Sequence, residues 1–121
     1  MDKKNNNRRK SKLNKAQIEI INNYISSINK KIDVAGVLLF GSYAYGKPKK
    51  FSDVDLVIIS SDFQRRNFFK RMDWLTRERM GIADDVAMDV IGYTPKEFSN
   101  IEDKSAIMEK AKKDGIWLYQ K

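Results

Sequence analysis

The chain has 121 residues with 24 basic and 16 acidic side chains, a formal net charge of +8, and this length predicts one domain. Cysteine and histidine are absent, which excludes disulfides, thiolate or imidazole metal sites and serine-histidine hydrolase chemistry. Because no apolar run approaches the ~18 residues of a membrane span and the N-terminus lacks the apolar core of a signal peptide, we expect a cytoplasmic protein with no membrane contact.

The positive charge is concentrated at the N-terminus. Seven basic residues and one acidic residue lie within residues 1–15, so the other 106 residues have a net charge of only +2. Residues 1–11 contain three consecutive asparagines and no apolar residue after Met1, which predicts a disordered basic arm. Such an arm can bind nucleic acid through its phosphates, or it can have no specific partner. The folded domain is therefore expected to span residues 12–121.

Isoleucine recurs at helical spacing after the arm, at Ile18, Ile21, Ile25 and Ile28. These spacings of three and four predict an amphipathic helix from Asn14 to about Lys30. Two short apolar runs rich in β-branched residues follow, Val34–Phe40 and Val54–Ile59. Both are bounded by turn residues and are expected to be buried strands.

The segment between these strands contains a basic loop and two aspartates. Asp53 and Asp55 are two positions apart, so both side chains face the same side of the strand, roughly 6.6 Å apart along it. Two carboxylates on one face repel each other and lose hydration, a cost that a hard cation such as Mg²⁺ relieves. The loop between the strands contains three lysines, Lys47, Lys49 and Lys50. They can neutralise phosphate oxygens, or they can form a solvated loop tip.

Gly41 and Ser42 come directly after the first predicted strand. A residue without Cβ permits close approach of a ligand, and the amides that open a short helix can bind phosphate. Taken singly, Gly41-Ser42 and Ser52-Asp53 are also compatible with ordinary turns. Their combination at this spacing predicts a site shared by phosphate, metal and carboxylates.

The pattern consists of Gly41-Ser42, ten further residues and Asp53-Val54-Asp55, with Ala44, Gly46, Ser52 and Leu56 also in place. It resembles the polymerase-beta-like nucleotidyltransferase superfamily and, within it, the stand-alone minimal nucleotidyltransferases. The resemblance covers about residues 14–121, although many members carry an arginine where this chain has Tyr45. We expect an α/β domain with a small, mixed, twisted sheet of about four strands and helices on one face.

The next segment predicts a helix from Phe63 to Met80 that starts at Ser61-Asp62. At 100° per residue one stripe would face the core, and it consists of Phe68, Phe69, Met72, Leu75 and Met80. Phe63 and Trp74 project to the opposite face among arginines, which indicates a partner contact. Alternatively, the helix begins late or bends, and both aromatic residues reach the core.

A third strand is predicted at Val86–Ile91, with Asp89 alone among apolar neighbours. An isolated carboxylate in a strand is destabilising without a partner, and the nearest candidates are metal ions held by Asp53 and Asp55. In the superfamily a third carboxylate on a neighbouring strand completes the metal site, so the resemblance implies the same residue. The remaining predicted elements are a short helix opened by the Thr94–Glu97 capping box, a helix over about Glu102 to Lys113 and a last strand at Ile116–Tyr119.

The resemblance implies transfer of a nucleoside monophosphate, AMP from ATP, to a hydroxyl with release of pyrophosphate. Asp53 and Asp55 would hold two Mg²⁺ ions, and Asp89 would complete the ion that activates the acceptor hydroxyl. These three aspartates are the predicted catalytic and metal-binding residues. The predicted nucleotide-binding residues are Gly41, Ser42 and Lys47.

The acceptor stays open at this point, since recognition would come from a partner or a second copy of the chain. Minimal nucleotidyltransferases often accompany a helical HEPN-type toxin as its antitoxin, and some adenylylate a tyrosine of that toxin. A binding module that neutralises such a partner by contact, with little turnover, is one alternative. An adenylyltransferase of the aminoglycoside type, acting on a small molecule, is another.

Overall fold

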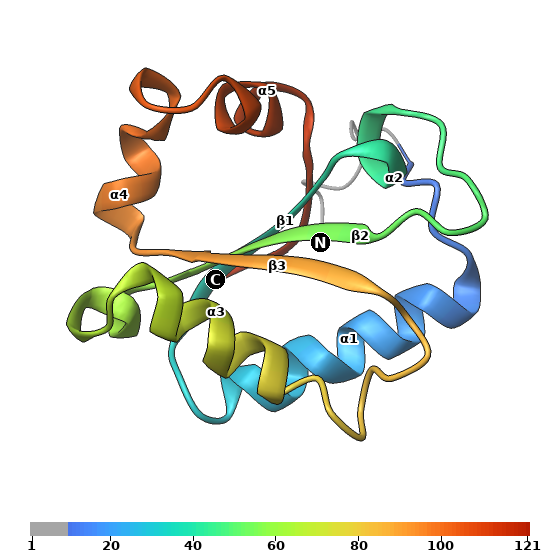
Figure 1. The fold of residues 1–121 in the computed structure, drawn as a ribbon, viewed down its shortest axis with the longest axis horizontal. Helices are drawn as coiled ribbons and strands as arrows, with labels where there is room; N and C mark the ends of the chain where they lie inside the picture. The colour runs from blue at the N-terminus through green and yellow to red at the C-terminus, as the bar shows by residue number, and fades with distance from the viewer. Residues whose placement is uncertain (1–9) are drawn as a thin grey trace.

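The structure, a computed structural model, describes residues 10–121, so most of the predicted arm over residues 1–11 lies outside the described part. Figure 1 shows how its elements are arranged. In chain order they are α1 (Lys15–Asn29), β1 (Val34–Phe40), α2 (Ser42–Tyr45), β2 (Val54–Ser60), the 3-10 helix η2 (Ser61–Arg65), α3 (Phe68–Arg77), β3 (Met88–Tyr93), α4 (Pro95–Ser99), the 3-10 helix η3 (Ile101–Asp103), α5 (Ala106–Asp114) and β4 (Ile116–Gln120). None of the helices in this part of the chain is long and apolar enough to span a membrane.

The four strands form one mixed sheet in the order β3-β2-β1-β4, which confirms the predicted fold class. Strand β1 is antiparallel to β2 and β4, and β2 is parallel to β3. The parallel pair is possible because η2 and α3 form the crossover between its strands. This arrangement places the end of β1 beside the starts of β2 and β3.

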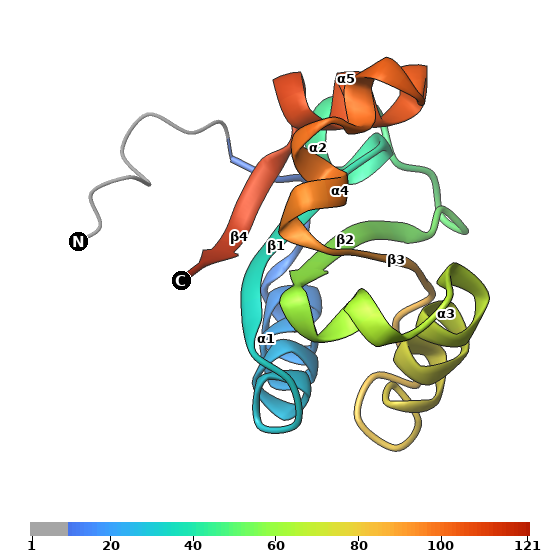
Figure 2. The same cartoon turned by 90° about the vertical axis from the view of Figure 1, so that its left-hand side faces the viewer.

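Helices cover both faces of the sheet (Figures 1 and 2). One face packs against α1 and α3, whereas the other packs against α4, η3 and α5. Consecutive residues of β1 belong to different cores, because Leu39 faces the first group of helices and Leu38 the second. The expectation of helices on one face was therefore wrong. The near-continuous apolar runs of β1 and β2 are typical of strands buried on both faces.

Helix α1 forms where the isoleucine spacing predicts it. Asn14 and Gln17 make a reciprocal capping box at its start. Its buried residues are Ile21, Tyr24, Ile25 and Ile28, while Ile18 is 42% exposed. The Tyr24 hydroxyl donates a hydrogen bond of 2.7 Å to the Leu75 carbonyl, which ties α1 to α3.

The single helix predicted from Phe63 to Met80 was wrong. The chain forms η2, becomes extended at Arg66 and then starts α3, where Asn67 accepts a capping bond from the Lys70 amide. This break changes the phase of the residues on either side of it. Within the predicted core stripe, Leu75 is fully buried as expected, whereas Phe68 is 47% exposed, Phe69 79% and Met80 72%.

The alternative prediction, in which the helix is interrupted and Phe63 and Trp74 reach the core, agrees with the structure. Phe63 is fully buried beneath β3, where a Cβ at Gly92 would lie 2.9 Å from its ring. Trp74 is half-buried against the same core as Leu75, and the Arg66 guanidinium lies 5.1 Å from its ring centre. The two aromatic residues are therefore not an exposed pair.

Candidate active site

The register of the sheet brings the predicted carboxylates together. Asp55, the second residue of β2, lies opposite Phe40 of β1 on one side and opposite Asp89 of β3 on the other. Residues opposite each other in neighbouring strands point to the same face, and the strands are about 4.8 Å apart. Asp53 precedes β2 and shares the parity of Asp55. All three aspartates thus lie on the face that packs against α4 and α5 further along the strands.

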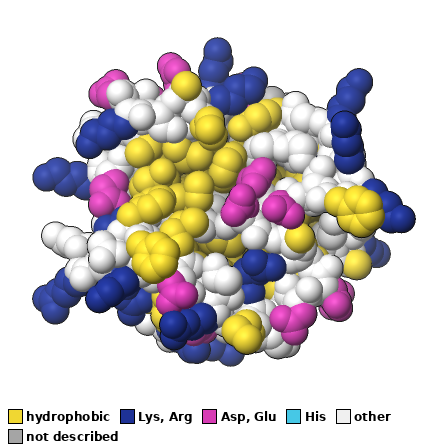
Figure 3. All heavy atoms as spheres, viewed as in Figure 1, with side chains coloured by type: hydrophobic (Ala, Val, Ile, Leu, Met, Phe, Trp, Pro, Cys, Tyr) yellow, Lys and Arg dark blue, Asp and Glu magenta, His cyan; other side chains and the backbone are white. Residues whose placement is uncertain are grey.

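Figure 3 shows acidic side chains near the middle of the visible surface, beside a hydrophobic area. Asp55 is half-buried, and its pKa is raised from 3.8 to about 6. The causes are burial first, then the negative charges of Asp89 and Asp53. Because both neighbours raise this pKa, the three carboxylates form one electrostatic unit that a cation would stabilise.

The donor set of this unit fits a hard divalent cation. It consists of carboxylate oxygens alone, which suit Mg²⁺ better than softer transition metals. Within residues 10–121, no three acidic side chains already stand in a metal-binding arrangement. Asp53 and Asp89 are exposed and can rotate, whereas Asp55 is held between strands. The residues that would hold the ion are therefore Asp55 with Asp53 and Asp89.

Gly41 lies beside Asp55 on the β1 side of the site, whereas Asp89 lies on the β3 side. Gly41 has φ 73° and ψ −155°, a conformation that is essentially restricted to glycine. A Cβ here would overlap the Asp55 Oδ2 atom and would lie 3.1 Å from Asp55 Cγ. Glycine is thus required both by the backbone and by the neighbouring carboxylate. The second requirement depends on the sheet register and could not be derived from the sequence.

Ser42 and Lys47 lie at the two ends of the turn after β1. Ser42 is half-buried and opens α2, and its carbonyl accepts a hydrogen bond of 3.1 Å from the Gly46 amide. Lys47 is exposed on the following loop. This loop closes through a bond of 2.8 Å from the Lys49 amide to the Ser52 hydroxyl, which fixes the chain just before Asp53.

A hollow of about 570 Å³ lies further along β3, at this edge of the sheet, between the start of α3, the end of β3 and α4. Tyr93 connects it to the carboxylates, because Asp89, Ile91 and Tyr93 alternate onto one face of β3. Sequence reasoning missed this hollow. Its lining comprises Asn67, Phe68, Arg71, Tyr93, Lys96, Glu97, Asn100, Ile101 and Lys104.

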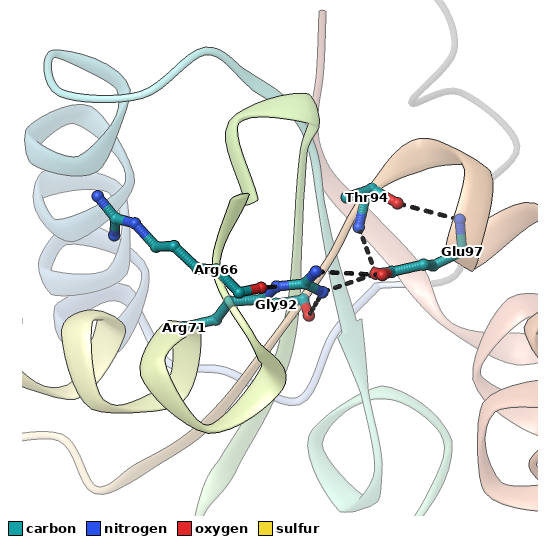
Figure 4. Close-up of polar contacts among 5 residues, drawn as sticks. All are labelled: Arg66, Arg71, Gly92, Thr94 and Glu97. Carbon is teal, nitrogen blue, oxygen red and sulfur yellow. Dashed lines mark hydrogen bonds and ion pairs between the residues drawn. The ribbon is translucent and has the colours of Figure 1, made fainter. Parts of the chain in front are cut away.

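The wall of the hollow is held by Arg71, a buried arginine that sequence reasoning also missed (Figure 4). Its Nη1 and Nη2 atoms donate to Glu97 Oε1 and Oε2 over 2.6 and 3.1 Å. Nη1 also donates to the Gly92 carbonyl over 3.3 Å, and Nε donates to the Arg66 carbonyl over 2.9 Å. One side chain therefore joins the start of α3 to β3 and α4.

Residues 18–117 match the family described as the nucleotidyltransferase domain. This match spans most of the chain, and the chain belongs to this family. It is therefore a nucleotidyltransferase, as the motif around Gly41, Asp53 and Asp55 predicts. The narrower assignment to the minimal nucleotidyltransferases stays a prediction.

The fold is similar to the crystal structure, at 1.40 Å resolution, of a protein from Sulfolobus solfataricus assigned as a nucleotidyltransferase. The two share 20% sequence identity with a TM-score of 0.63, over 88% of this chain and 82% of that chain. At this identity the likeness supports the fold alone. A search of curated proteins gave no significant match.

Proposed function

We propose that this nucleotidyltransferase transfers AMP from ATP to a hydroxyl group in a reaction that requires Mg²⁺. The observation that carries the proposal is the position of Asp55. This residue lies between Asp89 and the Gly41 turn, and its pKa is raised by burial first and then by the charges of Asp89 and Asp53. A nucleoside triphosphate bound at the turn would place its α-phosphorus beside three carboxylates.

The chain's residues would act by positioning and by charge. Asp53, Asp55 and Asp89 would hold two Mg²⁺ ions, which supply charge neutralisation and lower the pKa of a bound hydroxyl. Backbone amides at Gly41 and Ser42 would contact the β- and γ-phosphates, since the first turn of a helix leaves N–H groups without intrahelical acceptors. Lys47 would add a positive charge near the departing pyrophosphate.

The reaction exchanges one phosphorus–oxygen bond for another. The acceptor oxygen attacks the α-phosphorus, the bond from that phosphorus to the bridging oxygen breaks, and pyrophosphate leaves with the electron pair. The proton of the acceptor hydroxyl passes to a carboxylate oxygen of Asp89. Holding the two reactants in line contributes most of the acceleration in such a transfer.

The reaction can be tested with ATP that is radiolabelled at either the α- or the γ-phosphate. With a cell extract as the source of acceptor, [α-³²P]ATP should label a product, whereas [γ-³²P]ATP should not. Asp55→Asn and removal of Mg²⁺ by EDTA should each reduce the labelling roughly a thousandfold or more, since each removes charge stabilisation of the transition state. Wild-type labelling by the Asp53→Ala, Asp55→Ala double variant would refute the mechanism.

Fractionation of the labelled product separates the acceptor classes. Label in protein would support adenylylation of a tyrosine in a HEPN-type partner, and with it a role in a toxin-antitoxin system. Label in a small molecule would support the aminoglycoside type of activity. A chain that binds and neutralises its partner without turnover would leave all fractions unlabelled, even in the presence of that partner.

A further inference from the structure

The hollow lies on the opposite side of Asp55 from the Gly41 turn. In the sheet order, β2 has β1 on one side and β3 on the other, so Phe40 and Asp89 flank Asp55. Gly41 follows Phe40, whereas Tyr93 lies four residues beyond Asp89, about 13 Å along the strand. If the donor phosphates bind at Gly41, a molecule in the hollow approaches the carboxylates from the other side. That side is where an acceptor must lie for in-line transfer.

The hollow offers aromatic surface to a ligand. The rings of Phe68 and Tyr93 lie 5.8 Å apart between their centres and are tilted by 43°. Phe68 is 47% exposed and Tyr93 is half-buried, so neither ring is fully covered by the protein. Aromatic side chains that remain accessible in a hollow suit stacking with a flat ring.

The hollow also carries excess positive charge. Arg71 and Glu97 neutralise each other through their two-atom contact. Lys96 and Lys104 remain, and neither forms an ion pair with any residue in the described part of the chain. A lining with two uncompensated cations beside two aromatic rings favours a ligand that combines a flat ring with an anionic group.

We propose that this hollow binds a nucleotide unit of the acceptor. The base stacks on Phe68 and Tyr93, a phosphate contacts Lys96 and Lys104, and the reacting hydroxyl reaches Asp89. The volume of about 570 Å³ lies within the usual range for small-ligand sites. This inference rests on the proposed nucleotidyl transfer, and it assigns the acceptor to nucleotides or nucleic acid.

Fluorescence anisotropy with a labelled single-stranded oligouridylate of six residues tests the stacking surface. The titration is done with Mg²⁺ and a non-hydrolysable ATP analogue, so that the donor site is occupied. Phe68→Ala should weaken oligonucleotide binding roughly tenfold, the size expected for one stacked base. Phe69→Ala is the matched control, because Phe69 is the next residue, is 79% exposed and lies outside the lining. It should leave the affinity unchanged.

The role of the positive charge in the hollow is tested by a second pair of variants, one inside the hollow and one outside it. Lys104→Gln should weaken oligonucleotide binding and make it less sensitive to salt. Lys30→Gln removes the same charge beyond the end of α1, on the opposite face of the sheet, and should have little effect. Competition by uridine monophosphate then separates the sources of the ligand. Strong competition supports a free nucleotide, and weak competition supports the end of a strand.

Several outcomes would overturn this assignment. These are an equal loss in Phe68→Ala and Phe69→Ala, no loss in either, or a loss of affinity for Mg²⁺–ATP rather than for the oligonucleotide in Phe68→Ala. The last result would make the hollow the site of the donor base. A tyrosine-containing peptide that binds more tightly than the oligonucleotide, and depends on Phe68, would favour a protein acceptor instead. Failure of the wild-type chain to bind Mg²⁺–ATP by calorimetry would refute the proposed function, while the oligonucleotide titrations would still test the hollow.

Discussion

Gly41 lies so close to Asp55 that a Cβ at position 41 would overlap the carboxylate oxygen Oδ2. The contact connects the turn after β1 to the half-buried carboxylate of β2. It means that a substitution at Gly41 acts on the carboxylate site as well as on the backbone.

Gly41→Ala should therefore cost more stability than an ordinary glycine substitution. Gly81 is a suitable control, because it also has positive φ, at 81°, but a Cβ there would meet nothing within 4 Å. Gly81→Ala should cost about 1 kcal/mol from backbone strain alone. Gly41→Ala should cost about 2–3 kcal/mol, since strain and displacement of Asp55 add. Equal losses in urea denaturation would show that the contact with Asp55 is unimportant.

Asp55→Asn should stabilise the protein at neutral pH in the absence of divalent metal. The folded pKa of Asp55 is about 6 and the ordinary value is 3.8, so its ionisation opposes folding increasingly above pH 3.8 and to the full extent above pH 6. The shift corresponds to at most about 3 kcal/mol, and screening by water reduces it, so we expect a gain of about 1–2 kcal/mol at pH 7. The gain should shrink as pH falls from 6 to 4, where wild-type Asp55 becomes protonated. A constant difference over this range would contradict the raised pKa.

Glu97→Gln should destabilise the contact between α3 and α4. Arg71 is buried and would lose its carboxylate partner, whereas Glu97 has a side chain that is 43% exposed. We therefore expect a loss of about 1–2 kcal/mol rather than the full cost of a buried pair. The hydrogen bond from Arg71 lowers the pKa of Glu97, so its contribution should be present above pH 4.5 and should disappear as pH falls through the lowered value.

The control for this pair is Glu102→Gln, which removes an exposed contact of 2.7 Å with Lys112. Its effect on stability should be smaller than that of Glu97→Gln at neutral pH. Thermal melts of the two variants between pH 3 and pH 7 separate the buried contact from the exposed one. If both variants lose equal stability, the burial of Arg71 does not strengthen its contact with Glu97.

Phe63→Ala should be among the most destabilising substitutions in the η2–α3 segment. Phe63 is fully buried beneath β3, and its removal leaves a cavity that should cost about 3–4 kcal/mol. Phe69→Ala should change stability by less than about 0.5 kcal/mol, because that ring is 79% exposed. Trp74→Ala should lie between the two. A smaller loss for Phe63→Ala than for Phe69→Ala would support the uninterrupted helix.

The relation between sequence and structure differs from element to element. The isoleucine spacing in α1, the apolar run in β1 and the Thr94–Glu97 capping box depend on neighbouring residues, and all three elements form where they are predicted. The pairing of Asp53 and Asp55 on one face is equally local, since it follows from the alternation of a strand. Such features can be predicted from a single sequence.

Features that depend on distant contacts could not be predicted in this way. Arg71 looks like one of several exposed arginines on a helix, and its burial depends on Glu97, 26 residues further along the chain. The interruption at Arg66 occurs in a segment that has no proline or glycine to indicate it. The interruption accompanies the burial of Phe63 under β3, a tertiary contact, and Asn67 caps the helix that follows it. The second helical layer is different, because the near-continuous apolar runs of β1 and β2 are themselves a sequence signal for burial on both faces.

Strand β4 has a protective role that follows from its place in the sheet. It covers the outer side of β1, a strand whose side chains are buried on both faces. If β4 detached, β1 would present a row of unpaired backbone groups along an apolar strand, which is a template for pairing with other chains. The carboxylates would keep their neighbours, since β2 and β3 lie on the other side of β1. Release of the last strand would therefore expose the chain to aggregation before it disturbed the arrangement of the three aspartates.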